Sequence, residues 1–182
     1  HYPLRRQRQM CIRDRAGTYR VYADFTPAGE EAEGITLTRA IEVAGDFTPV
    51  ETEAQPTDEV DGYTVSLNGD LTAGTSSELT ISVERDGQPV TTLEPYLGAF
   101  GHLVALREGD LAYLHVHAEG DEPQARDTAG PEIGFAAEAP TADRYLLYLD
   151  FQVDGQVHTA EFVIDAEHGD GSQTDDSHTG GH

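Results

Sequence analysis

Apolar and polar residues alternate along most of the chain, in short runs separated by turn-forming residues. From Gly62 onward seven such runs follow one another, and none has a helical period of useful length. They are YTVSLNG, SELTISVERDGQPV, GHLVALREGD, LAYLHVH, PEIGFAAEAP, RYLLYLDFQVDGQ and VHTAEFVID. Asp-Gly pairs within RDGQ and VDGQ are typical of tight hairpin turns. The pattern predicts an all-β, antiparallel β-sandwich over residues 62–165.

Tyr145 indicates which kind of sandwich this is. It follows a tight turn and opens the penultimate predicted strand, the place of the tyrosine in an immunoglobulin-like tyrosine corner. Tyr19 stands at the same place in a similar segment near the start of the chain. The alternative is ordinary aromatic core packing. We expect an immunoglobulin-like fold.

An internal repeat predicts the domain organisation. AGTYRVYADF at residues 16–25 and ADRYLLYLDF at residues 142–151 share five residues at the same offsets, and a polar turn and one more strand follow each. We therefore interpret residues 16–47 as the last two strands of a similar sandwich whose front is missing. The acidic residues 48–61, with two prolines, are interpreted as a linker, and residues 166–182 as a disordered acidic, histidine-containing tail.

Residues 1–15, HYPLRRQRQMCIRDR, differ from the rest of the chain. They hold five of the 11 basic residues, the only cysteine and the only methionine. QRQMCIRDR resembles a translated sequencing adapter, so we interpret this segment as an artefact and leave it out of the fold. The alternative is a basic arm or the stub of a signal peptide, although the apolar region of a signal peptide is lacking.

Charge and cysteine content exclude several functions. The chain has 34 acidic residues and a formal net charge of −23, which argues against binding nucleic acid or anionic lipid. A salt-adapted source organism would also explain this charge. Without Cys11 the chain offers no disulfide and no thiolate ligand, so a blue-copper site is excluded. No apolar run is long enough for a transmembrane helix.

Three histidines lie within residues 101–117, GHLVALREGDLAYLHVH. Alternation puts His115 and His117 on one face of their strand. With an even hairpin loop, His102 shares that face. We expect the loop to contain two residues, so that His102 lies directly opposite His115 with His117 on the diagonal, close enough to share an ion.

The loop length decides this geometry. A two-residue loop at 108–109 pairs Arg107 with Asp110 at the mouth of the hairpin. A three-residue loop would instead place His102 opposite Val116 and send it to the other face.

Three neutral imidazoles suit Cu(II), Zn(II) or Ni(II), with copper bound most tightly. An oxygen of Tyr113, Glu119 or Asp121 could complete the shell. The alternative is that these histidines are ordinary polar positions of a strand. His158 begins the last strand on its apolar face, so it is interpreted as a buried histidine, with a role as an accessory ligand left open. His168, His178 and His182 lie in the tail and could gather metal loosely.

The segments LEPYLGAFGHLVALREGDLAYLHVH and GPEIGFAAEAPTADRYLLYLDFQVDGQVHTAEFVI resemble a family of actinobacterial secreted or membrane-attached proteins labelled heavy-metal-associated or copper-handling. The resemblance covers roughly residues 60–165. The family motif usually ends in HVHP, and here Ala118 replaces the proline, which leaves the histidines in place. The resemblance implies an immunoglobulin-like domain outside the cytoplasm with a capacity for metal binding.

These patterns lead to two functional hypotheses. The first is a non-enzymatic, extracytoplasmic protein that binds a copper-like metal through His102, His115 and His117, with a protein partner in the cell envelope. No nucleophile elbow, phosphate loop or zinc-protease motif points to an enzyme. The second is a structural or interaction module in which the histidines are incidental.

Overall fold

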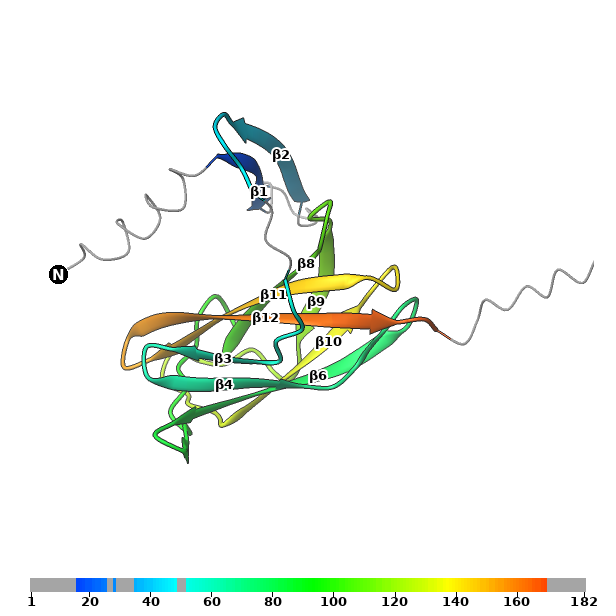
Figure 1. The fold of residues 1–182 in the computed structure, drawn as a ribbon. Coiled ribbons are helices and arrows are strands. Elements are labelled where there is room, and N and C mark those ends of the chain that lie inside the picture. Colours follow the sequence, from blue (N-terminus) through cyan, green and yellow to red (C-terminus); the bar gives the residue numbers. More distant parts are fainter. Residues whose placement is uncertain (1–15, 26–27, 29–34, 49–51, 170–182) are drawn as a thin grey trace, which may run out of the picture. The chain divides into compact units, whose positions relative to one another are not determined.

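A computed structural model describes residues 16–25, 28, 35–48 and 52–169. The chain divides into two compact units, His1–Glu51 and Thr52–His182. Within the described ranges every regular element is a β-strand (Figure 1). None of the residues placed by the structure forms a helix suited to crossing a membrane.

The second unit is an immunoglobulin-like β-sandwich, as predicted. One layer contains β3, β4, β6 and β10, the other contains β8, β11 and β12, and β9 pairs with a strand of each layer (Figure 1). All seven predicted strands are present, as β4, β6 and β8–β12. The strands are β3 (Thr57–Val60), β4 (Tyr63–Asn68), β5 (Leu71–Thr72), β6 (Ser76–Arg85), β7 (Gln88–Pro89), β8 (Gly101–Arg107), β9 (Tyr113–Ala118), β10 (Glu132–Glu138), β11 (Arg144–Val153) and β12 (Gln156–Glu167).

Strict alternation fills the core between the two layers. Every second residue of β11 points inward, and Tyr145, Leu147, Leu149 and Phe151 are all fully buried. The matching alternation in β6 and β10 supplies the opposite wall, which includes Leu79, Ile81, Ile133 and Phe135. The period of two in the sequence therefore specifies which face of each strand is removed from water.

Asp-Gly turns fix three hairpins. The two predicted turns, 86–87 and 154–155, connect β6 to β7 and β11 to β12. In each, both residues have positive φ, the conformation of the type I′ turn that follows the twist of paired strands. A third such turn, at 61–62, connects β3 to β4.

The predicted linker, residues 48–61, is shorter in the structure because its second half belongs to the sandwich. Gln55 forms an antiparallel bridge with Val163, and β3 follows at once. The Asp58 carboxylate accepts a hydrogen bond of 2.9 Å from the backbone N–H of Glu161 on β12. This acidic strand has no apolar period, so hydropathy did not indicate it.

The last strand runs past the predicted boundary at residue 165. Ala166 is buried and pairs in parallel with Leu71 of the short strand β5, and β12 ends at Glu167. The rest of the predicted tail, from residue 170, lies outside the described residues.

The described residues of the first unit form a two-stranded antiparallel hairpin of β1 (Gly17–Phe25) and β2 (Ile35–Val43). Its register pairs Gly17 with Val43 and Phe25 with Ile35. Two strands were predicted in residues 16–47, and both are present. Residues 1–15, interpreted above as an artefact, lie outside the described residues.

Gly101 lies where β8 meets the core, and we predict that Gly101→Ala is destabilising. A Cβ atom there would lie 2.9 Å from Ile133 Cδ1 and 3.1 Å from Leu149 Cδ1, both in the packed interior. Overpacking of this kind costs about 1–3 kcal/mol, measurable by urea unfolding.

Gly134→Ala is the matched control, since Gly134 lies in β10 on the outer face. There the added methyl group meets the carboxylate end of the Glu119 side chain, which can move into solvent. Equal losses of unfolding free energy in the two variants would contradict the packing argument.

Candidate metal site on strand β9

Strand β9 carries the histidines that the sequence singled out. Leu114 is buried and Val116 is half-buried, so the alternate positions 113, 115 and 117 lie on the outer face of the strand. Tyr113 and His117 are exposed there. The shared face of residues 113, 115 and 117 follows from the strand register and agrees with the prediction.

The predicted register between β8 and β9 is wrong by two residues. Leu106 pairs with Tyr113 and Ala105 with Leu114, whereas the two-residue loop required Arg107 to pair with Asp110. His102 is therefore not opposite His115. Because the shift is an even number of residues, His102 stays on the outer side.

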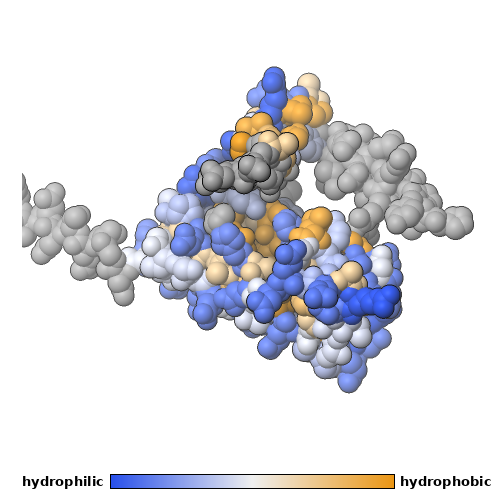
Figure 2. Space-filling view, turned by 180° about the vertical axis from the view of Figure 1, so that it is seen from behind, coloured by the Kyte–Doolittle hydropathy of each residue, from blue (hydrophilic) through white to orange (hydrophobic). Residues whose placement is uncertain are grey.

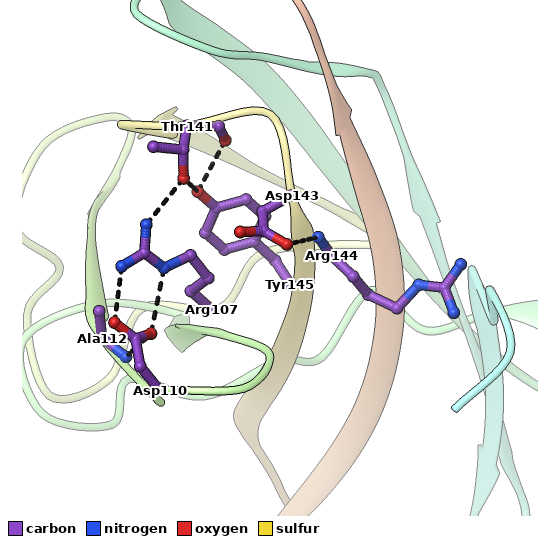
Figure 3. Close-up of polar contacts among 7 residues, drawn as sticks. All are labelled: Arg107, Asp110, Ala112, Thr141, Asp143, Arg144 and Tyr145. Carbon is purple, nitrogen blue, oxygen red and sulfur yellow. Dashed lines mark hydrogen bonds and ion pairs between the residues drawn. The ribbon is translucent and has the colours of Figure 1, made fainter. Parts of the chain in front are cut away.

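The two-residue difference in register arises because the β8–β9 loop is longer than predicted and is closed by side-chain hydrogen bonds. The Arg107 guanidinium donates to both carboxylate oxygens of Asp110, at 3.0 and 2.6 Å. The same carboxylate accepts a bond of 3.0 Å from the Ala112 backbone N–H (Figure 3). The Leu111 N–H donates to the Arg107 carbonyl. Asp110 is therefore part of the loop and not of the strand.

The pairing of β8 with β9 ends after the pairs Leu106–Tyr113 and Ala105–Leu114. From His115 onward β9 pairs with β10 of the other layer, where His115 lies opposite Glu138 and His117 opposite Ala136. β8 instead continues beside β11, with His102 opposite Asp150. β8 and β9 thus have different partner strands at the positions of their histidines. Strand pairing therefore does not place His102 beside His115 or His117.

His102 is exposed, and its neighbours are polar residues of β11 and β12, in the same layer as β8. Asp150 is its neighbour on β11, and the Asp150 carboxylate accepts a bond of 2.5 Å from the Thr159 hydroxyl on β12. The described side chains include no group of three or more potential metal ligands. In the strand register His102 has Asp150 as its partner and is paired with neither His115 nor His117.

Glu119, just after the end of β9, continues the outer face that carries His115 and His117. Its backbone N–H donates to the Gly134 carbonyl, which continues the pairing with β10. Its carboxylate lies over Gly134, where a side chain would collide with it. His115 and His117 on β9 and Glu119, which directly follows its last residue, thus occupy every second position of this segment, and we call these three residues the β9 ligand set. Asp121 lies farther along, in the exposed loop after β9.

His158 is buried, as predicted, and lies apart from the β9 ligand set. Its ring contacts those of Tyr63 and Phe151, with centroids 4.8 and 5.3 Å away. Its Nδ1 is 2.9 Å from an Asp61 carboxylate oxygen. Being in the core, it is not placed to complete a site on the outer face. Of the tail histidines, His168 is exposed and the other two lie outside the described residues.

Tyr145 forms the predicted tyrosine corner. Its hydroxyl donates to the Thr141 backbone carbonyl at 2.9 Å, four residues upstream. The Thr141 hydroxyl accepts a bond of the same length from Arg107, so the corner also holds the β8–β9 loop (Figure 3). Sequence reasoning missed the roles of Arg107 and Thr141, and the arginine-acid spacing within REGD was the available signal.

A second ion pair joins the ends of β11 and β12. The Arg144 guanidinium contacts both oxygens of the Asp165 carboxylate, at 2.7 and 3.0 Å, and also donates to the Thr52 carbonyl. The hydrogen bonds from Arg144 lower the pKa of Asp165. Asp165 is more than half exposed, so solvent screens the pair and its contribution to stability is small.

Comparison with known proteins adds a family assignment for the second unit. One family profile, described as a domain of unknown function (DUF8832), matches residues 58–168. No curated protein and no solved structure matches the chain.

Removing the Tyr145 hydroxyl should weaken the sandwich. Tyr145→Phe loses the hydrogen bond to the buried corner, and we expect the free energy of unfolding to fall by about 1 kcal/mol in urea titrations. Tyr148→Phe, on the outer face of the same strand, is the control and should change stability less. A larger loss in Tyr148→Phe would contradict the role of the corner.

The Asp165 pKa should depend on Arg144. We expect carbon-detected NMR titration to show the Asp165 pKa below its ordinary range, and Arg144→Gln to raise it. Because the pKa is lowered in the folded state, the stabilisation is present above the unfolded-state pKa and is lost as pH falls through the folded-state pKa. Arg107→Gln, which removes the partner of Asp110, should leave the Asp165 titration unchanged.

Proposed function

The chain belongs to the family of domains of unknown function DUF8832, and we propose that its sandwich binds a transition metal ion on the outer face of β9. Copper is the first choice and zinc the second. The proposal further assigns a non-enzymatic role outside the cytoplasm, with a protein partner in the cell envelope.

The observation that carries this proposal is the spacing of the β9 ligand set. His115 and His117 alternate on β9, and Glu119 continues the alternation one residue past its end. Positions two apart in extended chain lie about 7 Å apart, a distance that two side chains bound to one ion can span. Two imidazoles and a carboxylate are ligands that suit Cu(II) and Zn(II). His102 comes from the neighbouring strand, and its part is the weakest because β8 and β9 separate before reaching it.

The charge of the protein supports a cationic ligand. A formal net charge of −23 raises the local concentration of cations, and β10 places Glu138 beside His115 in the register. The resemblance to secreted and membrane-attached proteins with heavy-metal labels supports the location and the choice of metal. These arguments favour an ion over an anionic or nucleic-acid ligand.

Metal-dependent unfolding of the full chain tests the proposal. One equivalent of Cu(II) or Zn(II), with excess chelator as the blank, should raise the free energy of unfolding. Binding to the folded state alone adds about 2.7 kcal/mol when free metal is a hundredfold above its dissociation constant. His115→Ala/His117→Ala should abolish the rise, and Glu119→Gln should reduce it.

Two controls separate the strand site from other histidines. His102→Ala tests the fourth donor, and a joint His178→Ala/His182→Ala variant removes tail ligands. A rise that survives the β9 double variant and disappears with the tail variant would refute the proposed site. Absence of any rise would favour the second hypothesis, a structural or interaction module.

The interaction module is supported by one observation of its own. The β1–β2 hairpin exposes Val21, Leu37 and Ile41, large apolar residues on one face (Figure 2). An exposed apolar surface of this kind often marks a place where another protein surface packs.

A further inference from the structure

The β1–β2 hairpin repeats the register of the β11–β12 hairpin. Tyr19 pairs with Ile41 as Tyr145 pairs with Ile164, so the two tyrosine–isoleucine pairs coincide. The alternate pairs that follow are then equivalent in position: Val21–Arg39 to Leu147–Phe162, Ala23–Leu37 to Leu149–Ala160, and Phe25–Ile35 to Phe151–His158. The sequence repeat is thus also a repeat of strand pairing.

The same positions differ sharply in burial between the two hairpins. Leu147 and Ala160 are 0% exposed in the second unit. Their counterparts Val21 and Leu37 are 49% and 57% exposed. Figure 2 shows this apolar surface on the hairpin of the first unit. The residues of a sandwich core are present on β1–β2, but among the described residues nothing buries them to the same degree.

The second unit identifies what covers such a face. Tyr63 of β4 contacts Phe151 edge-on, with centroids 5.5 Å apart. Ile133 and Phe135 of β10 approach Leu149 beside Gly101. This cover consists of residues that precede β11 in the chain and reach it through the short turn that holds the tyrosine corner.

We propose that β1–β2 is the closing hairpin of a second immunoglobulin-like sandwich, and that its apolar face packs against a sheet equivalent to β4, β6 and β10 contributed by polypeptide that precedes the hairpin. The face consists of Tyr19, Val21, Ala23, Phe25, Ile35, Leu37, Ile41 and Val43. The functional unit is then a pair of tandem sandwiches. This inference does not depend on metal binding.

One position of the face departs from the pattern. Arg39 stands where Phe162 stands in β12. A cover over this position must supply a hydrogen-bond acceptor for the guanidinium, because an unpaired buried charge is strongly destabilising. The natural cover therefore differs from the β4–β6–β10 sheet of the second unit opposite residue 39.

A chimeric chain tests the proposal. A copy of residues 52–142 is placed directly before Gly17, replacing residues 1–16, so that the hairpin follows the copy as β11 and β12 follow the original. A second version adds Arg39→Phe to match this cover. Hydrogen exchange is then measured for the amides of residues 17–43, which should exchange rapidly in the natural chain because a lone hairpin is marginally stable.

We expect residues 17–43 to gain at least tenfold slower exchange in the Arg39→Phe chimera, together with a second unfolding transition. Adding Val21→Asp should abolish the gain, while Thr38→Asp on the opposite face should preserve it. Unchanged exchange in both chimeras would overturn the proposal. Concentration-dependent protection in the natural chain would also overturn it, by assigning the face to a second copy of the hairpin.

Discussion

Burial of the inner row of β11 is the interaction on which the sandwich depends. Tyr145, Leu147, Leu149 and Phe151 lie on a central strand between β8 and β12 and are removed completely from water. Each large apolar side chain so buried contributes about 1.5–3 kcal/mol. Because these side chains contact both layers, they set the spacing at which every other strand must pack.

The change of partner by β9 follows from this two-layer core and governs the candidate site. β9 begins beside β8 in one layer and ends beside β10 in the other, so it connects the two layers. Over the residues that carry the histidines, β9 is paired with β10 and no longer with β8. The proposed ligands on β9 therefore stay on one segment, whereas His102, the proposed ligand on β8, is paired with β11. The change of partner strand thus separates residues of β8 from those of β9, but it does not separate residues that follow one another along β9.

Local patterns in the sequence predicted most of the fold. Alternation located seven strands, and Asp-Gly pairs located two of the three type I′ turns, because both signals act over a few adjacent residues. β3 and β5 were missed since they are short and are held by contacts with distant β12. The β8–β9 register was predicted wrongly for a similar reason. The ion pair between Arg107 and Asp110, together with Thr141, closes a longer loop than the residue spacing alone suggested.

The two hairpins separate what local sequence determines from what packing determines. β1–β2 and β11–β12 share the same register, so strand pairing follows from the repeat itself. Burial does not, since Leu147 is enclosed and Val21 is half exposed at equivalent positions. The apolar face of the β1–β2 hairpin remains partly in water. Burying it would stabilise the protein by roughly 25 cal/mol for each Å² of apolar surface removed from water. Strand pairing alone does not provide this stabilisation, so the apolar face of β1–β2 is better explained as one wall of a sandwich than as a surface suited to solvent.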